Sequence, residues 1–593
     1  MLRPTHRELL LDALRPEPGF TLDRAVGTTF SLDLDALLTT PLAFALFDVD
    51  SSGGSADPMA LLAAIKSYAR RMTLYCDAAH IAVPDRDNAL FQLLEPIVRP
   101  VLQPGGAFHP KLWVLRFRAA DDDELRHRVL VLSRNLTFDR SWDTLLRLDE
   151  DADVDGDRPP NTSELADFLG ELARRAPSAA IEDLLLTLPG VSLAAPTPFS
   201  SLRFWTVGAG RSDPLGDVAE AALLVVSPFA TPRRLDTLAP LARRRVLVTR
   251  TETLDNLGAR ALREWDETYV LHGEAMDGVE GTELSGLHAK VFIVDDGREQ
   301  RVFTGSANAT SAAFERNVEL LVELRSAHRT TRVAALLDDH DELGFRRLLV
   351  ARGAADEEPI EETAEEAERA RLESLVAALA AQALTADAHA DDEGRWSVTV
   401  RLNISEVGFG SHDALRARPV TATTAWQTMT MSEQRAEAVL PLGAPSRVTS
   451  LVAFELAARG GIEVEPVRFV LVADLQGAPA DREERLLLDM LPDADRVMRL
   501  LFLLLADGRH GQEASGEVRR LLGAGTDGES WAPALPLFEN LVRTFARDPG
   551  RLATVRGVVE QLSATEEGRR RLPDRFLDLW TAFDAALAAD GSS

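Results

Sequence analysis

The chain repeats one order of apolar runs and polar motifs, and this internal duplication limits its fold more than any other feature. In the first copy, FHPKLWVLRF (108–117) is followed by VLVLSRNLT (129–137). In the second copy, LHAKVFIVDD (287–296) is followed by RVFTGSANAT (301–310). Apolar β-branched runs that alternate with helix-period stretches predict a buried mixed sheet covered by helices. The copies lie about 180 residues apart, which is too long for a solenoid repeat and predicts two fused α/β domains.

Each copy is expected to begin with a strand well ahead of these motifs. We place the first such strand at 41–50 (PLAFALFDVD) and its counterpart at 220–230 (EAALLVVSPFA). Both are short apolar runs of the length of a buried strand. A helix-like stretch and a second apolar run follow each of them, so both copies have the same predicted order of elements.

Three further segments follow the duplicated region. Residues 356–393 contain 13 acidic and 2 basic residues, which favours a solvated helical connector. Short alternating runs such as WSVTVRLNI (396–404) and VRFVLVADL (467–475) predict a small β-sandwich or barrel. Apolar residues at helical spacing in the C-terminal part predict a helical bundle. The predicted units are two α/β domains at 1–190 and 191–350, an acidic helical linker at 351–394, a β-rich domain at 395–480 and a helical domain at 481–593.

The chain contains three lysines among its 65 basic residues, and two of them stand two residues after a histidine. These are Lys111 after His109 and Lys290 after His288, whereas Lys66 has no such partner. With so few histidines, chance would produce two such pairs only about once in a thousand times. An ammonium is a compact point charge that can sit against one phosphate oxygen, which a larger guanidinium does less easily. The two lysines therefore indicate a shared need to hold an anion.

Strand geometry brings the polar groups of each copy together. Residues i and i+2 of a strand project from one face about 6.6 Å apart, so each histidine and its lysine point the same way. The next strand ends in Ser133 and Asn135 in the first copy and in Ser306 and Asn308 in the second. The same spacing gives each serine and asparagine a common face. We expect these strand ends to reach a cleft.

The second copy resembles the phospholipase D superfamily, whose motif is His-x-Lys, an aspartate five residues later, and then Gly-Ser-x-Asn. The matching residues are His288, Lys290, Asp295, Ser306 and Asn308, with Glu319 at the place of a family carboxylate that orients an active-site histidine. The resemblance covers about residues 28 to 330.

The first copy is a looser match, formed by His109, Lys111, Ser133 and Asn135. Arg116 stands where the motif has aspartate, and the counterpart of Glu319 falls near Asp143 or Thr144. The missing aspartate and the SRNLT ending are more similar to nuclease-like members and to the tyrosyl-DNA phosphodiesterase branch than to the lipases.

The resemblance implies two phospholipase D-like domains in a pseudo-twofold arrangement, with one active site between them that uses no metal and no cofactor. In this family one histidine attacks phosphorus to form a phosphohistidine. The other protonates the leaving oxygen and then activates water. By family precedent we assign His109 to the attack and His288 to the acid and base steps. Supporting roles fall to the two lysines, the two asparagines, Ser133, Ser306, Asp295, Glu319 and Asp143.

Composition narrows the functional classes. The formal net charge of −29 argues against a binder that uses its whole surface for nucleic acid, although a locally positive cleft is compatible with it. A single cysteine, Cys76, excludes a disulfide framework, and no stretch of about 18 uncharged apolar residues occurs. We therefore expect a cytoplasmic protein that does not contact a membrane.

The leading hypothesis is a nuclease or DNA-end-processing phosphodiesterase, in a bacterial defence or repair complex with an ATPase or helicase partner. Two alternatives stay open: an enzyme that hydrolyses phospholipids or transfers phosphatidyl groups, and an inactive phosphate-binding scaffold. The oligomeric state is not predicted.

Two other groups of polar residues have a plain interpretation. His80, His127, His272 and His328 lack a partnering motif and are predicted to be surface or core histidines. A set of arginines is predicted to cover a solvated helix face. The alternative is that these arginines line a channel that holds phosphate groups. This arginine group consists of Arg233, Arg234, Arg243, Arg244, Arg245 and Arg250.

Overall fold

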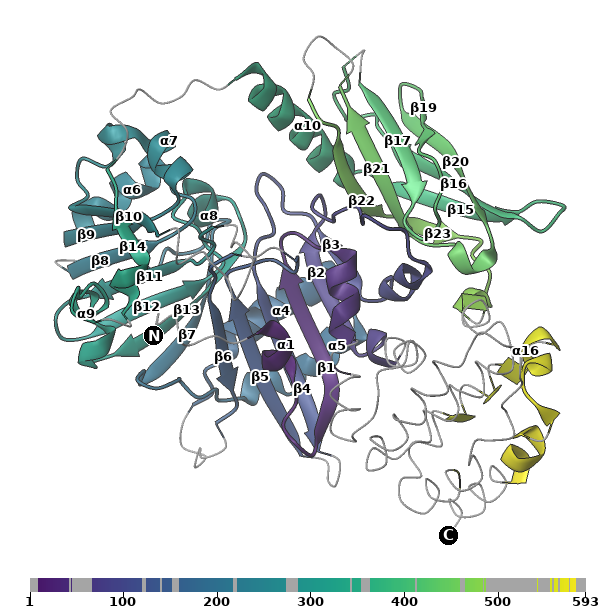
Figure 1. Cartoon of the computed structure of the whole chain (residues 1–593), viewed down its shortest axis with the longest axis horizontal. Helices are drawn as coiled ribbons and strands as arrows, with labels where there is room; N and C mark the ends of the chain where they lie inside the picture. The colour runs from purple at the N-terminus through teal and green to yellow at the C-terminus, as the bar shows by residue number, and fades with distance from the viewer. Residues whose placement is uncertain are drawn as a thin grey trace, which may run out of the picture.

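The computed structural model describes most of the chain as far as residue 486. The described residues are 9–41, 44, 67–119, 124–138, 141–151, 159–216, 221–272, 286–341, 344–353, 363–410, 413–458, 464–483 and 485–486, with 541, 555–556, 559–560, 562–563, 566–574 and 576–582. Figure 1 shows two α/β halves side by side and a β-rich unit next to the first of them. This arrangement confirms the predicted α/β fold with mixed sheets.

A six-stranded mixed sheet forms the first half, in the order β3-β2-β1-β4-β5-β6. The pairs β1–β2 and β2–β3 are parallel, and the others are antiparallel. The strands are β1 (Phe20–Thr29), β2 (Met72–Asp77), β3 (Val98–Val101), β4 (Leu112–Ala119), β5 (Leu125–Leu132) and β6 (Leu145–Asp149). The helices are α1 (Leu10–Leu14), α4 (Ser163–Arg175) and α5 (Ala179–Leu185).

The opening strand of the first half lies earlier than predicted. It is β1, whereas the described residues of the run 41–50, Pro41 and Phe44, are helical. The polar residues of FTLDRAVGTT hid this strand, because only its second half is continuously buried. Burial on both faces makes the other inner strands easier to recognise from their apolar runs.

An eight-stranded mixed sheet forms the second half, in the order β14-β10-β9-β8-β11-β12-β13-β7. Its strands are β7 (Ser201–Val207), β8 (Ala221–Val226), β9 (Ala242–Val248), β10 (Glu267–Leu271), β11 (Val291–Asp295), β12 (Gln300–Gly305), β13 (Glu319–Ser326) and β14 (Leu349–Ala351). Its helices are α6 (Pro232–Leu238), α7 (Thr251–Ala261), α8 (Ser311–Glu315) and α9 (Val333–Leu336). As in the first half, a central strand has a parallel neighbour on one side, β9 beside β8, and an antiparallel neighbour on the other, β11.

The two halves share a continuous apolar core. Leu112 and Val129 of the first sheet and Val291 and Val322 of the second belong to one buried cluster. At the junction, the hydroxyl groups of Thr144 and Thr304 lie 3.2 Å apart. The two sheets therefore meet along one seam, close to the ends of β5 and β12.

The β-rich unit consists of a five-stranded sheet, β19-β20-β16-β15-β23, and a four-stranded sheet, β18-β17-β21-β22, around one apolar core. Helix α10 (Ala364–Ala380) begins with a capping box of Thr363 and Glu366 and packs its leucines into this core. The strands are β15 (Leu384–Ala390), β16 (Trp396–Asn403), β17 (Ala414–Pro419), β18 (Gln427–Thr428), β19 (Thr430–Met431), β20 (Arg435–Gly443), β21 (Leu451–Ala457), β22 (Val467–Val472) and β23 (Asp474–Gln476).

The helical linker predicted at 351–394 is shorter than expected. Helix α10 accounts for its middle, but β15 already forms an inner strand of the five-stranded sheet between β16 and β23. Part of the acidic composition that suggested a connector lies on α10 and in the turn after β15, and the acidic residues at 356–362 lie outside the described residues.

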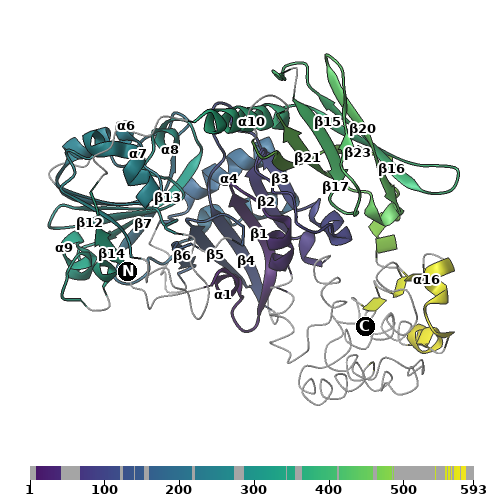
Figure 2. The same cartoon turned by 45° about the horizontal axis from the view of Figure 1, so that its top comes forward.

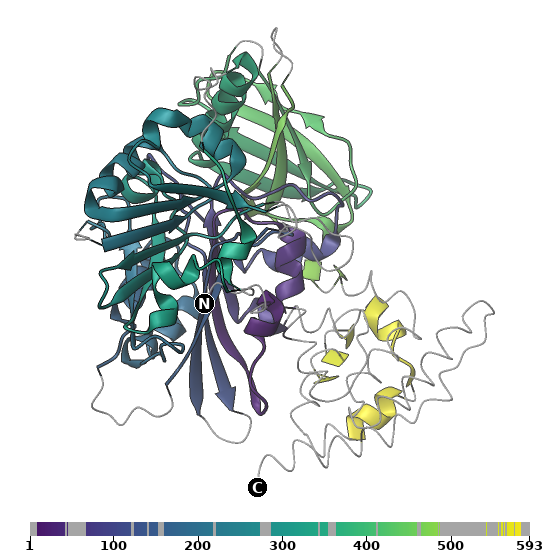
Figure 3. The same cartoon turned by 60° about the vertical axis from the view of Figure 1, so that its left-hand side comes forward.

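The β-rich unit packs on the first half, as Figures 2 and 3 show from two further sides. Val420, Leu451 and Val470 join the apolar cluster of the first half. Arg482 forms an ion pair of 2.7 Å with Glu95, and the side chain of Arg418 pairs with Asp87. The β-rich unit and the first half are thus held together by an interface with both polar and apolar contacts.

Most of the helical domain predicted at 481–593 lies outside the described residues. The described pieces are helical, including α16 (Glu566–Arg570). In the described part of the chain, no helix has both the length and the apolar composition that crossing a membrane requires.

Candidate active site

The two His-x-Lys motifs stand at equivalent places in the two sheets. Lys111 directly precedes β4, and Lys290 directly precedes β11. Each of these strands runs antiparallel beside the central strand of its sheet. The residue after each lysine pairs with the end of that central strand, at Thr28 in β1 and at Val226 in β8. The duplication seen in the sequence is therefore a duplication of strand register.

Backbone hydrogen bonds tie each motif to the opposite half. The amide of His109 donates to the carbonyl of Val318 at 2.9 Å. The amide of His288 donates to the carbonyl of Trp142 at 2.8 Å. Val318 belongs to the second half and Trp142 to the first, so the two histidines lie on either side of the same seam. The expected meeting of the two motifs is present.

A buried glutamate organises the first histidine. Glu319 is 0% exposed, and its Oε2 lies 2.8 Å from Nδ1 of His109. The hydroxyl of Ser306 donates to the same oxygen at 2.5 Å, and the side-chain NH₂ group of Asn317 donates to Oε1 at 3.1 Å. Because a carboxylate only accepts hydrogen bonds, the proton of neutral His109 sits on Nδ1 and its Nε2 carries a lone pair.

The lysines are buried beside their histidines. Lys111 and Lys290 are each 1% exposed, and each Nζ donates to the carbonyl of its own histidine at 2.9 Å. The Nζ of Lys290 also lies 3.2 Å from Nδ1 of His288. When Lys290 is protonated it can only donate, and the contact then makes Nδ1 an acceptor and puts the proton of neutral His288 on Nε2. At Nε2 the two histidines thus offer opposite groups, a lone pair on His109 and an N–H on His288.

Burial lowers the pKa of all four of these side chains. The pKa of His109 falls to about 4, mainly through burial, with a contribution from the two lysines that Glu319 opposes. The pKa of His288 falls to about 2 through burial and then through the nearby cations. Burial also lowers the pKa of Lys111 to about 7 and that of Lys290 well below its usual range. The two histidines and two lysines lie close together, and the negative charge nearby does not balance their positive charge when they are protonated. An oxyanion bound between them would therefore favour their protonated forms.

Asn135 and Asn308 add a matched pair of polar groups. The side-chain oxygen of each asparagine is buried and lacks a hydrogen-bond partner among the described residues. Buried polar atoms without partners are uncommon, and here they occur at equivalent positions of both halves. A half-turn of the amide replaces the oxygen by an NH₂ group, which can donate to a phosphate oxygen.

The two serines fasten the strand that follows each motif. Ser133 accepts a hydrogen bond from the amide of Thr144 at 2.8 Å, and Ser306 accepts one from the amide of Leu320 at 3.0 Å. Ser306 also contacts Glu319, as described above, so its role extends to the carboxylate. Both serines are 0% exposed and support the site from beneath.

Asp143 has the position in the first half that Glu319 has in the second, directly after the residue that accepts the histidine amide. Its carboxylate lies 3.7 Å from Nε of Arg134, and its charge opposes the lowering of the pKa of Lys290. Asp143 therefore supplies negative charge beside Lys290.

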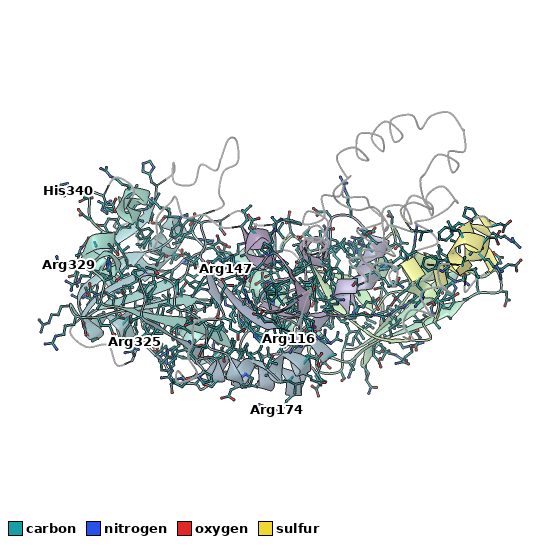
Figure 4. The ribbon with its side chains drawn as sticks, turned by 90° about the horizontal axis from the view of Figure 1, so that it is seen from below. Arg116, Arg147, Arg174, Arg325, Arg329 and His340 are labelled. Atoms are coloured by element: carbon teal, nitrogen blue, oxygen red, sulfur yellow. The ribbon has the colours of Figure 1, made fainter. Side chains whose placement is uncertain are left out.

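Two residues of the motif regions lie away from the site. Asp295 ends β11, where its carboxylate accepts from the amides of Gly297 at 2.9 Å and Val333 at 3.2 Å. This corrects the prediction of Asp295 as a supporting site residue, because five residues of strand separate it from the lysine by about 16 Å. Arg116, which replaces the aspartate in the first copy, is buried and donates to Asp23 at 2.7 Å (Figure 4).

Two functional positions were missed or left undecided by the sequence. Oδ2 of Asp77 accepts from the amide of Phe108 at 2.9 Å, and Nε of Arg250 donates to the carbonyl of Leu287 at 2.7 Å. Phe108 and Leu287, the residues that these side chains hold, directly precede the two motif histidines. Asp77 and Arg250 occupy equivalent places, two residues beyond the strand partners of Thr28 and Val226 respectively. Nothing in their local sequence marks either of them.

Within the arginine group, Arg250 is the member that contacts the site. Four others pair with carboxylates elsewhere in the second half, as Arg233–Glu315, Arg234–Asp213, Arg244–Glu267 and Arg245–Asp266. The predicted solvated helix face fits Arg233, whose side chain is 75% exposed. It is wrong for the other three, because Arg234 is buried and Arg244 and Arg245 lie on β9.

This arrangement can perform nucleophilic substitution at phosphorus. It has a lone pair on His109, a proton donor on His288 and two ammonium groups beside them, which is the set needed to attack, protonate a leaving oxygen and balance charge. The described residues contain no group of three or more His, Cys, Asp or Glu side chains placed to hold a metal ion.

Residues 239–340 match the protein family described as cardiolipin synthase, PLD-like domain, a segment that contains the second His-x-Lys and Ser-x-Asn motifs. Comparison with curated protein sequences gave no match.

Two solved structures are similar to the chain over part of its length. The polyphosphate kinase of Porphyromonas gingivalis is 13% identical with a TM-score of 0.31, and the similarity covers 61% of this chain and 50% of the kinase. The phosphatidylserine synthase of Haemophilus influenzae Rd KW20 is also 13% identical with a TM-score of 0.31, covering 58% of this chain and 84% of the synthase. The chain thus spans about half the length of the polyphosphate kinase.

Proposed function

We propose that this chain belongs to the phospholipase D superfamily and is a nuclease that cleaves DNA through a phosphohistidine intermediate. Its PLD-like domain indicates phosphodiester hydrolysis or phosphoryl transfer as the general chemistry. The observation that carries the proposal is the unequal pair of Nδ1 partners, Glu319 beside His109 and Lys290 beside His288, from which we infer a lone pair on Nε2 of His109 and an N–H on Nε2 of His288.

In the first step the lone pair on Nε2 of His109 attacks phosphorus. The bond from phosphorus to the leaving oxygen breaks, and His288, charged as an imidazolium while the phosphate is bound, passes the proton on Nε2 to that oxygen and becomes neutral. In the second step Nε2 of His288, now without its proton, takes one from a water molecule that attacks phosphorus. The phosphorus–nitrogen bond then breaks and both histidines return to their starting forms. Lys111 and Lys290 stabilise the charge on the non-bridging oxygens in both steps. These side chains supply each group that the reaction needs, so the proposed steps require no bound metal ion.

Aromatic rings close to the site support a nucleic acid as the substrate. Phe138 is 61% exposed and lies three residues after Asn135, and Phe229 is 46% exposed. No other aromatic ring among the described residues is as open to solvent. The guanidinium of Arg250 lies 4.9 Å from the centroid of Phe229. Exposed rings and arginines hold the bases of single strands with little sequence preference, so we propose a single-stranded segment of DNA as the substrate.

The test is cleavage of labelled DNA by the full chain in EDTA. We expect single-stranded DNA to be cut, and His109→Ala and His288→Ala each to abolish cleavage. His340→Ala is the matched control, because His340 is exposed and lies at the outer edge of the second half (Figure 4). RNA and phospholipid vesicles are assayed beside DNA. A strict requirement for divalent metal, or headgroup release from vesicles without DNA cleavage, would contradict the proposal.

The cellular setting is part of the proposal. A defence or repair complex with an ATPase or helicase partner is our prediction from the large region after the second half. Co-purification of the full chain with such a partner would test it, and an isolated chain that cleaves DNA at full rate would argue against a need for one.

A further inference from the structure

His80 is an exposed histidine held beside the site by a buried carboxylate. The side chain of His80 is 44% exposed, whereas that of Asp77 is 9% exposed, and Nδ1 of His80 lies 2.7 Å from Oδ1 of Asp77. The carboxylate accepts, so Nδ1 carries a proton and Nε2 is the nitrogen left for a ligand. Among the described residues Nε2 of His80 has no hydrogen-bond partner.

Asp77 and Phe30 connect this imidazole to the proposed nucleophile. The other carboxylate oxygen of Asp77 holds the amide of Phe108, next to His109. The ring of Phe30 lies 4.0 Å from the ring of His80 and 4.9 Å from the ring of His109, measured between centroids. One phenylalanine ring therefore contacts both imidazoles, and His80 lies in the immediate surroundings of His109.

The loop that carries His80 is fixed on two sides. The carbonyl of His80 accepts from the amide of Leu32 at 2.9 Å, and the amide of Ala82 donates to the carbonyl of Leu32 at 2.8 Å. On the other side, the amide of Val470 in the β-rich unit donates to the carbonyl of Ile81 at 2.8 Å. A histidine exposed merely by chance needs no such restraint, whereas a binding residue gains affinity from it.

We infer that His80 is a substrate-binding residue that contacts the phosphate next to the scissile one, an inference that rests on the proposed nuclease function. An imidazole with both nitrogens protonated donates to Asp77 through Nδ1 and to a phosphate oxygen through Nε2. The contact would then be a charge-assisted hydrogen bond. The substrate is accordingly a strand with at least two consecutive phosphodiesters.

The inference also gives the substrate a direction. At the position equivalent to Asp77, the second half has Arg250, which lies beside Phe229 on the side of His288. The two ends of the site thus differ, with an imidazole on one side and a guanidinium on the other. A strand with its own polarity is expected to bind in one orientation.

The experiment compares wild type and His80→Ala on three thymidine trinucleotides. One has two ordinary phosphates, and the other two carry an uncharged methylphosphonate at the first or at the second linkage. Both kcat/KM and affinity are measured, with affinity determined in the inactive His288→Ala background. His340→Ala serves again as the control variant.

We expect one methylphosphonate isomer to be about tenfold weaker than the all-phosphate strand with the wild type. With His80→Ala this difference should disappear, because the variant already lacks the contact to the phosphate next to the scissile one. His340→Ala should keep it.

The inference is overturned if His80→Ala leaves the difference intact, or if it lowers kcat on all three strands equally without changing affinity. Binding without cleavage by the wild type would defeat the proposed function and still test the role of His80. Binding of none of the strands would overturn both.

Discussion

Replacing Glu319 by glutamine tests how His109 is oriented, because the change removes a charge and keeps the shape. Glu319 receives three hydrogen bonds, from His109 and Ser306 on Oε2 and from Asn317 on Oε1. A glutamine has one oxygen with which to accept them. If that oxygen faces His109, the new NH₂ group meets the NH₂ group of Asn317. If the amide is turned round, its NH₂ group faces Nδ1 of His109, which must then accept, and the proton moves to Nε2.

Both orientations weaken the nucleophile. The first removes the negative charge that supports a positively charged phosphohistidine, and the second removes the lone pair from Nε2. When a serine protease loses the carboxylate that fixes its histidine tautomer, kcat falls by about 10⁴-fold. We therefore expect Glu319→Gln to lower kcat by about 10³- to 10⁴-fold. Unpaired buried donors cost about 1–3 kcal/mol of stability, which leaves the fold intact in a protein with typical stability.

The assay is single-turnover cleavage of single-stranded DNA, paired with urea unfolding of each variant. Glu323→Gln is the matched control, since Glu323 lies on the same strand, is 1% exposed, and accepts from Trp205 at 2.8 Å and Arg301 at 2.7 Å. It should lose similar stability and keep its rate. If Glu319→Gln retains more than about a tenth of the wild-type rate, the tautomer argument is wrong.

Three further outcomes are expected. Protein denatured during turnover should carry the 5′ or 3′ nucleotide fragment on His109, and mass spectrometry that finds it elsewhere would reverse the assignment. Sulfate should bind with uptake of protons, and its affinity should fall as the pH rises through 7, because burial lowers the pKa of Lys111 to about 7 and the anion favours the protonated form. Calorimetry in two buffers with different heats of ionisation measures this proton uptake. Identical binding heats in the two buffers would exclude it. Gly208→Ala should lower the free energy of unfolding in urea by about 1–3 kcal/mol more than Gly210→Ala does. Both glycines have a positive φ, but a Cβ at Gly208 would lie 2.0 Å from the backbone oxygen of Asn317, whereas a Cβ at Gly210 has open space. Equal losses of stability would show that backbone strain alone is responsible.

The sequence predicted equivalent places for the two motifs because the duplicated order of elements implied the same register. The predicted position of each histidine and lysine on a strand is wrong, since they lie just before β4 and β11, where each lysine donates to the carbonyl of its own histidine. The pairing of Leu112 with Thr28 and of Val291 with Val226 follows that expectation. The mixed sheets could be predicted because their inner strands are continuous apolar runs.

Long-range contacts could not be predicted in this way. His80 has no motif around it. Asp77 lies only three residues before it, but the contact with Phe30 comes from a distant part of the chain, across the sheet. Asp295 matched a family pattern, yet its carboxylate holds the turn at Gly297, where a positive φ of 83° favours glycine. The strand β1 escaped detection because three charged or hydroxyl-bearing residues interrupt its first half.

Each half of the molecule supplies one histidine and restrains the histidine of the other half. Asn317 of the second half accepts from the amide of Ala107 at 3.1 Å and donates to Glu319, which in turn holds His109. In the opposite direction, the first half holds the backbone of His288 through Trp142. A half that folded alone would have its histidine without the partners that fix its position. The duplicated domains therefore form one site, and the unequal partners at Nδ1 give its two related histidines different chemical roles.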